Sequence, residues 1–142
     1  VPYKGSPEVL TATATGELDA AVEILSPALP QIRSGKVQAL AVTSATRFAG
    51  LPNVPTVAES GLPDYRATSW NALAAPAGTP QPVIDRLQRE INAAVNAPDV
   101  KARLLELGIV AQGGTPASTA KLLVSDIAKW GAVVKQAKIV KQ

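Results

Sequence analysis

The sequence opens with the stretch Val1-Pro2-Tyr3-Lys4-Gly5-Ser6-Pro7, which predicts the end of a β-strand, a tight turn and the start of a helix. Gly5 has no side chain, so the backbone there can turn tightly and approach a ligand. We expect Ser6 to be the N-cap, because its hydroxyl can accept from an unpaired N–H of the first turn. Pro7 suits the first helical position, where no N–H donor is needed. The stretch therefore predicts a strand tip beside the positive end of a helix, a place that binds anions such as carboxylates.

The same alternation of strands and helices continues through the first third of the chain. The first helix is expected to end at Gly16, and residues 18–24 alternate apolar and polar side chains, as a half-buried strand does. Ser26-Pro27 predicts a second helix, with Ser26 as another N-cap, that ends near Gly35. Residues 37–43 are apolar enough for a strand that is buried on both faces. This β-α-β-α-β order predicts a parallel sheet with right-handed crossovers.

The rest of the chain changes from mixed to helical. Thr56-x-x-Glu59 is a capping box and predicts a short helix, and residues 67–75 predict a long strand. Three helices are expected after Gly78. They start at Thr79-Pro80, at Pro98 and at Thr115-Pro116, and residues 109–111 between the last two predict a short edge strand. Trp130 lies on the apolar stripe of the last helix and is expected in the core.

The composition excludes several kinds of protein. The 142 residues are 46% hydrophobic, which is enough for one ordinary domain or for parts of two. Without cysteine or histidine the chain has no disulfide, thiolate metal site or ordinary serine triad, and we predict no cofactor. A net charge of +3 favours anionic partners, but no aromatic residues interleave with the C-terminal lysines, so nucleic acid is not expected. The absence of methionine and of a signal peptide predicts a processed product or a fragment.

Several motifs, taken in order along the chain, resemble a known family. They are Pro2-Tyr3-Lys4-Gly5, Gly16-Glu17-Leu18-Asp19, Gly35-Lys36-Val37-Gln38-Ala39-Leu40-Ala41-Val42-Thr43-Ser44, Leu51-Pro52-Asn53-Val54-Pro55-Thr56-Val57-Ala58-Glu59-Ser60-Gly61, Ser69-Trp70, Ala75-Pro76-Ala77-Gly78-Thr79-Pro80, Gly113-Gly114-Thr115-Pro116 and Ile127-Ala128-Lys129-Trp130. The chain resembles the Bug (TctC-like) proteins, the periplasmic solute-binding receptors of tripartite tricarboxylate transporters. The long string that begins at Leu51 is the most specific of these motifs.

The resemblance implies an α/β fold of the periplasmic-binding-protein type. Family members resemble type II Venus-flytrap proteins, in which two lobes of mostly parallel sheets flanked by helices enclose a cleft. Residues 1–66 would form the rear part of the second lobe, residues 67–75 the crossover strand, and residues 76–142 the helical part of the first lobe. The opening segments of both lobes would be absent. We therefore expect a dimer or a missing N-terminal segment to complete the fold, because an exposed sheet edge invites pairing.

The candidate ligand-binding residues gather where the predicted strands end and helices begin. They are Lys4, Gly5, Ser6, Pro7, Glu23, Leu25, Ser26 and Trp70. For the first stretch the alternative is a helix cap alone, and for Lys4 and Glu23 it is a solvated surface charge. The family often has Asp at the place of Glu23, where it could meet a ligand ammonium. Trp70 would line the cleft or pack at the hinge, and Thr43 and Ser44 are further candidates for a polar lining.

The resemblance implies an extracytoplasmic receptor and not an enzyme. The expected ligand is a small carboxylate, namely a dicarboxylate, a tricarboxylate, an amino acid or an aromatic acid. The expected partners are the membrane permease subunits of a tripartite tricarboxylate transporter, and the expected location is the periplasm. Two alternatives stay open. One is a ligand-free interaction or sensing module with the same fold, and the other is a hydrolase with Ser6 as nucleophile and Lys4 as base, for which the near-adjacent backbone positions give poor geometry.

Overall fold

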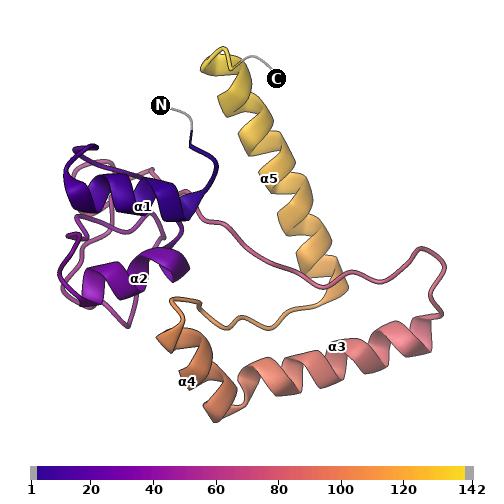
Figure 1. Ribbon diagram of the computed structural model, residues 1–142. Helices are drawn as coiled ribbons and strands as arrows, with labels where there is room; N and C mark the ends of the chain where they lie inside the picture. The colour runs from indigo at the N-terminus through magenta and orange to yellow at the C-terminus, as the bar shows by residue number, and fades with distance from the viewer. Residues whose placement is uncertain (1–2, 140–142) are drawn as a thin grey trace. The chain divides into compact units, whose positions relative to one another are not determined.

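The computed structural model describes residues 3–139, and the described chain forms five helices (Figure 1). They are α1 (Ser6–Thr15), α2 (Leu25–Arg33), α3 (Gln81–Asn96), α4 (Pro98–Glu106) and α5 (Pro116–Gln136). All five lie where a proline near a helix start and an apolar stripe predict them, so these predictions are confirmed. The predicted strand end at Val1-Pro2 lies outside the described residues.

Glycines end three of the five helices as expected. Gly16 follows α1 with φ of 80°, and its N–H bonds to the carbonyls of Ala12 and Thr13. Gly35 and Gly108 take the same left-handed conformation after α2 and α4, with φ of 72° and 78°. Because only glycine adopts this conformation at no steric cost, these positions stop each helix at a defined residue.

The predicted serine caps of the first two helices are wrong. The N-cap of α1 is Gly5, and Ser6 is the first helical residue, so Pro7 is the second. The N-cap of α2 is Ile24, whose φ and ψ of −66° and 135° are extended, and Ser26 lies inside the first turn. Neither N-cap has a side-chain capping bond. Ser6 differs from the prediction because its hydroxyl donates to the carboxylate of Glu23, a charged acceptor that forms the stronger bond.

Thr115 caps α5 as predicted. Its hydroxyl accepts from Ser118 N–H at 3.1 Å, and the Ser118 hydroxyl accepts from Thr115 N–H at 2.9 Å. Together these two bonds form a capping box in which serine takes the place of the usual glutamate. The short Ser118 side chain therefore satisfies the same backbone donor.

Within residues 3–139, none of the segments predicted as strands forms one. Residues 18–24, 37–43, 67–75 and 109–111 are extended or irregular, and one parallel bridge joins Val42 to Thr56. The expected burial of residues 37–43 on both faces is wrong, because Leu40 is 68% exposed. An extended segment becomes a strand only when neighbouring segments pair with its N–H and C=O groups. The described chain supplies such partners at residues 42–43 alone, where Val42 N–H donates to Pro55 and Ala67 N–H to Thr43.

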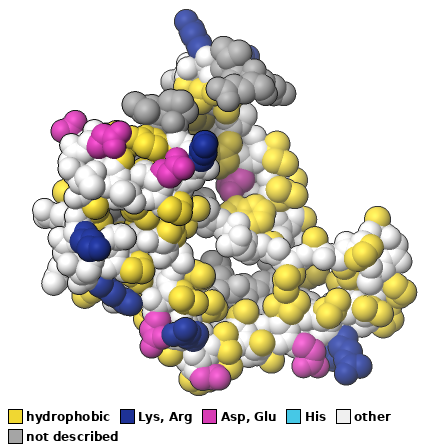
Figure 2. Space-filling view, in the orientation of Figure 1, with side chains coloured by type: hydrophobic (Ala, Val, Ile, Leu, Met, Phe, Trp, Pro, Cys, Tyr) yellow, Lys and Arg dark blue, Asp and Glu magenta, His cyan; other side chains and the backbone are white. Residues whose placement is uncertain are grey.

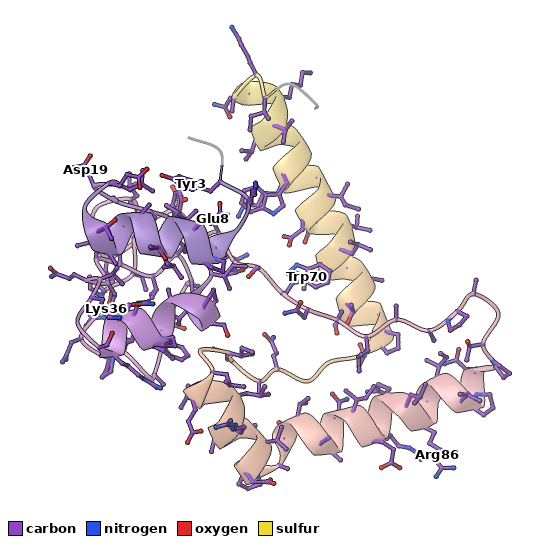
Figure 3. All side chains as sticks on the ribbon, viewed as in Figure 1. Tyr3, Glu8, Asp19, Lys36, Trp70 and Arg86 are labelled. Atoms are coloured by element: carbon purple, nitrogen blue, oxygen red, sulfur yellow. The ribbon has the colours of Figure 1, made fainter. Side chains whose placement is uncertain are left out.

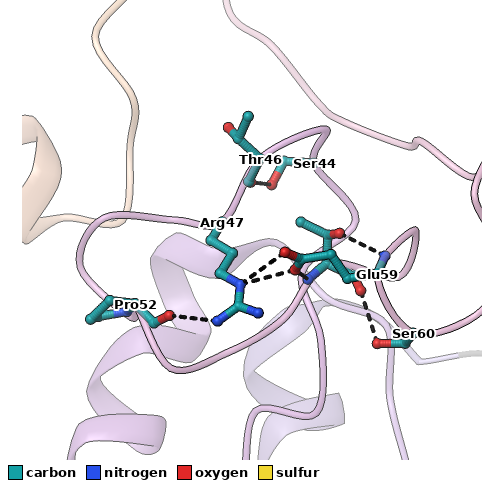
Figure 4. Close-up of polar contacts among 7 residues, drawn as sticks. Ser44, Thr46, Arg47, Pro52, Glu59 and Ser60 are labelled. Carbon is teal, nitrogen blue, oxygen red and sulfur yellow. Dashed lines mark hydrogen bonds and ion pairs between the residues drawn. The ribbon is translucent and has the colours of Figure 1, made fainter.

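The loop after this bridge is held by a network around Glu59 (Figure 4). Thr56 N–H donates to Glu59 Oε2 at 2.7 Å, and Glu59 N–H donates to the Thr56 hydroxyl at 3.0 Å, so the predicted capping box is confirmed. The segment after it is a turn, so the short helix predicted there is wrong. Arg47 Nε donates to both Glu59 oxygens, at 2.9 and 3.2 Å, and Arg47 Nη1 donates to the Pro52 carbonyl. The Thr56 amide, followed by the Arg47 guanidinium, lowers the pKa of Glu59.

The chain divides into two compact units. One contains Val1–Asn71 and Pro98–Ala111, and the other contains Ala72–Ala97 and Gln112–Gln142. In the first unit α1 packs against α2, and the buried apolar side chains are Leu10, Ala12, Ala28, Leu29 and Phe48. The division predicted from the sequence, at residues 66 and 76, stays a prediction.

The second unit has no fully buried side chain on its helices α3 and α5 within the described residues. Along α5 the apolar side chains are accessible, with Ile127 65% and Trp130 39% exposed, and Figure 2 shows hydrophobic side chains on the surface of this helix. The expectation that Trp130 lies in a core is therefore wrong for the described chain, because its side chain is accessible. No helix between residues 3 and 139 combines the length and the hydropathy needed to cross a membrane.

Candidate functional site

The structure brings together two of the predicted ligand residues, Ser6 and Glu23. They are 17 positions apart, and the Ser6 hydroxyl donates to Glu23 Oε2 at 2.6 Å. The backbone N–H of Ile24 donates to the same oxygen at 3.2 Å. Both side chains are half-buried. The first turn of α1 and the residue that precedes α2 by two positions therefore share one carboxylate oxygen, a contact that neither sequence pattern indicated.

The residues around Ser6 place both backbone N–H groups and acidic side chains at this end of α1. Gly5 has an extended backbone, with φ of 171° and ψ of 173°, and its carbonyl accepts from the N–H of Glu8 at 3.2 Å. The Glu8 carboxylate in turn accepts from Lys4 N–H at 3.1 Å. Lys4 and Pro7 are exposed. Anionic side chains are stabilised at the positive end of a helix, and here Glu8 and Glu23 both contact it.

One side of the start of α2 lies against the turn that follows α4. A Cβ atom on Gly108 would lie 3.2 Å from both N and Cα of Ser26 and 3.3 Å from the carbonyl carbon of Leu25. The backbone of this turn thus lies directly against the first turn of α2. Leu25 and Ser26 are half-buried as a result. The short distance explains why a residue without a side chain stands at position 108.

Tyr3 adds a titratable group that the sequence analysis did not single out. Burial raises the pKa of its phenol, and the neighbouring Glu17 carboxylate raises that pKa further by charge and by a hydrogen bond. Figure 3 shows the Tyr3 and Glu8 side chains near the same part of α1. Tyr3 lies one residue before Lys4, and this position beside the predicted turn is the sequence feature that could have identified it as a site residue.

Trp70 is the predicted ligand residue that comes last in the chain. It is 37% exposed and belongs to a segment with neither helix nor strand. Its role as a wall of a ligand cleft or as a hinge residue stays a prediction. A shallow depression of about 340 Å³ lies nearby in sequence, lined by Leu62, Pro63, Asp64 and Tyr65, and includes none of the predicted ligand residues.

The site offers hydrogen bonds and charge. Within residues 3–139 no group of three or more histidine, cysteine, aspartate or glutamate side chains is arranged to hold a metal ion. The predicted ligand residues offer backbone N–H groups, two serine hydroxyls, the Lys4 ammonium, the Glu23 carboxylate and the Trp70 indole. Such groups bind and orient a small polar molecule.

Known proteins match the chain along nearly all of its length. Residues 1–139 match the model of the tripartite tricarboxylate transporter family receptor, TctC. The UPF0065 protein in the tcbD-tcbE intergenic region of Pseudomonas sp. strain P51 is 40% identical over 92% of this chain and 39% of its own length. Protein BugT of Bordetella pertussis is 35% identical over 96% of this chain and 42% of its own length.

Solved structures agree with these sequence matches. An R. palustris protein solved with adipate has a TM-score of 0.85 at 34% identity and covers 97% of this chain and 46% of its own. MatC from Rhodopseudomonas palustris, solved with bound malate, has a TM-score of 0.76 at 34% identity, over 94% of this chain and 47% of its own. The periplasmic binding protein BugD has a TM-score of 0.75 at 29% identity, over 100% of this chain and 48% of its own.

The matched relatives and structures are longer than this chain, which spans less than half of each of those described above. Over that span its architecture is that of periplasmic binding proteins. The family model covers nearly every residue, from the first predicted ligand residue to the end of α5. The chain therefore belongs to the tripartite tricarboxylate transporter receptor family, the TctC or Bug proteins.

Proposed function

We propose that the chain is part of a periplasmic receptor that captures a small organic carboxylate for a tripartite tricarboxylate transporter. The observation that carries the proposal is the TM-score of 0.85, over 97% of the chain, with a protein that was solved with adipate. The family match over residues 1–139 supports the same function. The protein solved with malate is a second carboxylate-bound neighbour.

The starts of α1 and α2 are the proposed ligand contacts. Each presents N–H groups that have no partner inside the helix, and the helix dipole favours negative charge there. The first turn of α2 carries no acidic side chain, whereas the first turn of α1 carries Glu8. A carboxylate held by N–H groups needs no arginine, which fits the scarcity of cations among the predicted ligand residues.

Capture is proposed to work by closure of a cleft around the ligand. Fixed N–H dipoles replace the water shell of the carboxylate when the cleft closes. The permease subunits would then recognise the closed form, since closure changes the surface of the whole receptor. The opposite wall of the cleft would come from a further segment of the receptor or from a second copy of the chain.

Two alternatives make different demands on the same residues. A hydrolase would need the Ser6 hydroxyl to give its proton to a base such as Lys4, but this hydroxyl donates to the Glu23 carboxylate at 2.6 Å. An interaction module with the same fold would keep the helix starts without using them for a ligand.

Thermal unfolding with a panel of acids tests the proposal. The product of the complete gene is heated with adipate, malate, citrate and glutamate, and with adipamide as the uncharged counterpart of adipate. A ligand that binds only the folded state stabilises it by about 2.7 kcal/mol at a hundred times its dissociation constant. We expect at least one acid, but not adipamide, to raise the melting temperature. An unchanged melting temperature with every acid would favour the interaction module, and consumption of an acid would favour the enzyme.

A further inference from the structure

We propose that one face of α5 is an interface, covered in the complete receptor by a broad apolar layer that the remaining part of the receptor chain supplies. The proposal goes beyond the ligand site and does not depend on which molecule the receptor captures. Its basis is a set of large apolar side chains that lie exposed along one side of a 21-residue helix.

The apolar face of α5 takes up about half of the circumference of the helix at 3.6 residues per turn. Its members, all exposed, are Leu123, Val124, Ile127, Trp130, Val133 and Val134. The half-buried Asp126 lies near one edge of this face. The other half of the helix carries Lys121, Lys129 and Lys135. This separation of apolar from charged side chains is typical of a helix that packs on one side and faces water on the other.

A helix of this kind needs a packing partner. Most of the stability of helices in proteins comes from burial of an apolar face rather than from intrinsic propensity. Within the described residues, neither α3 nor α5 has a fully buried side chain. Large contiguous apolar patches on a protein surface mark interaction sites. The apolar face of α5 therefore has the character of an interface.

The width of this face favours a broad layer over a second copy of α5. Helices that pair as a coiled coil bury a narrow seam of a and d positions, which Leu123, Ile127 and Trp130 would fill here. Val124 and Val133 flank that seam, at the e and g positions where coiled coils often have charged residues. A narrow seam would leave both valines exposed, whereas a sheet or a second layer of helices can cover the whole face.

The lengths of the matched structures indicate where this layer comes from. The protein solved with adipate shares its backbone with 97% of this chain at a TM-score of 0.85, yet the match uses 46% of that protein. For MatC and BugD the matched share is 47% and 48%. More than half of each of these proteins thus lies outside the match and is available to pack against it. The remaining part of the receptor chain is therefore the proposed occupant of the face.

Thiol labelling of the product of the complete gene tests whether the face is covered. The 142 residues contain no cysteine, so a single introduced thiol can be followed in its own peptide by mass spectrometry. Ile127→Cys places the thiol at the centre of the face, and Ala132→Cys places it on the opposite, exposed side of the helix. We expect the thiol at position 127 to react at least about 100-fold more slowly than that at position 132, and both to react equally in urea.

Melting temperatures give a second readout with matched serine variants. Isoleucine and serine have similar helix propensities, whereas replacing alanine with serine lowers the propensity, so propensity alone predicts the larger loss for Ala132→Ser. If the face is covered, Ile127→Ser should instead lower the melting temperature by about 4 °C or more, and Ala132→Ser by about 1 °C. Ile127→Val, which removes a single methylene group, repeats the test if the serine variant does not fold.

The outcomes also separate the two possible occupants. Protection at position 127 that is unchanged on tenfold dilution of a monomeric protein, as judged by light scattering, supports the remaining chain as the occupant. Equal labelling rates at positions 127 and 132 in the folded protein overturn the proposal. A dimer that loses the protection on dilution assigns the face to a second copy and overturns it as well. None of these results bears on ligand capture, which the panel of acids tests separately.

Discussion

Replacing Asn92 with alanine tests the joint between α3 and the chain that enters α5. The Gly114 N–H donates to Asn92 Oδ1 at 2.9 Å, and Asn92 Nδ2 donates to the Gly114 carbonyl at 2.9 Å. A side-chain amide thus pairs with the Gly114 backbone as a neighbouring strand would. Each such bond contributes about 0.5 to 1.5 kcal/mol, and because both are exposed we expect about 1 to 2 kcal/mol for the pair.

Hydrogen exchange tests this joint directly, because the exchange rate of the Gly114 amide depends on whether its hydrogen bond to Asn92 is formed. A loss of about 1 to 2 kcal/mol raises the population of the open state about 5- to 30-fold, so exchange in peptides covering residues 110–118 should accelerate by that factor. Asn96→Ala is the matched control. It gives the same gain in helix propensity but removes an amide that donates to its own helix, to Asn92 O at 2.8 Å. Equal exchange at Gly114 in the wild type, Asn92→Ala and Asn96→Ala would refute the assignment of stability to the joint.

Gly113 provides an independent test of the same geometry. A Cβ atom on Gly113 would lie 2.6 Å from Asn92 Oδ1, too close for the amide to keep its place. Gly113→Ala should therefore accelerate exchange at Gly114 as Asn92→Ala does. The double variant should be no worse than either single one, since the truncated residue 92 leaves room for the new methyl group. Additive effects of the two substitutions would show that they act separately.

Three further substitutions follow from local geometry. Gly108→Ala should destabilise the protein by about 1 kcal/mol or more, because φ is 78° there and the new methyl group would meet Ser26; an unchanged urea midpoint would contradict this. Thr115→Ala removes the cap of α5 and should cost about 1 kcal/mol in thermal unfolding, with no loss if the capping box is idle. The pKa of Glu59 is lowered by Thr56 N–H first and by Arg47 next, so its stabilising contribution is fully present above the unfolded-state pKa of about 4.3 and is lost as pH falls through the lower folded-state pKa. Glu59→Gln should accordingly be less stable than the wild type at pH 7 and differ less in acid, and a difference that is equal at both pH values in urea titrations would contradict the assignment.

The helices were predictable because their signals are local. A proline near the start, an apolar stripe and a glycine after the last turn all lie within one segment, and Gly16, Gly35 and Gly108 end their helices as expected. The first residue of a helix was less predictable. Gly5 and Ile24 are the N-caps of α1 and α2, since an extended backbone suffices for that position and the hydroxyl of Ser6 has a charged acceptor elsewhere.

The strands were not predictable from the segments alone because a strand depends on its neighbours. Residues 18–24 have the alternation of a strand, yet Val22 is 87% exposed and the segment has no ladder in the described chain. Residues 67–75 are similar, with Leu73 77% exposed. Alternation reports which side chains would face a core, but pairing requires a second backbone at about 4.8 Å. The alternation therefore predicts which side chains would be buried in a sheet, but these side chains stay exposed because the segments are not paired in the described chain.

The candidate site illustrates a limit of a different kind, set by how many hydrogen bonds one group can make. The sequence predicted that Ser6 and Glu23 each face a ligand, and taken separately both predictions make chemical sense. In the structure the Ser6 hydroxyl donates a hydrogen bond to the Glu23 carboxylate, so one donor at the start of α1 already has an acceptor within the chain. The N–H of Ile24, the N-cap of α2, donates to the same carboxylate, so Glu23 contacts the starts of both helices. This contact joins residues that are 17 positions apart, so neither local sequence pattern could indicate it.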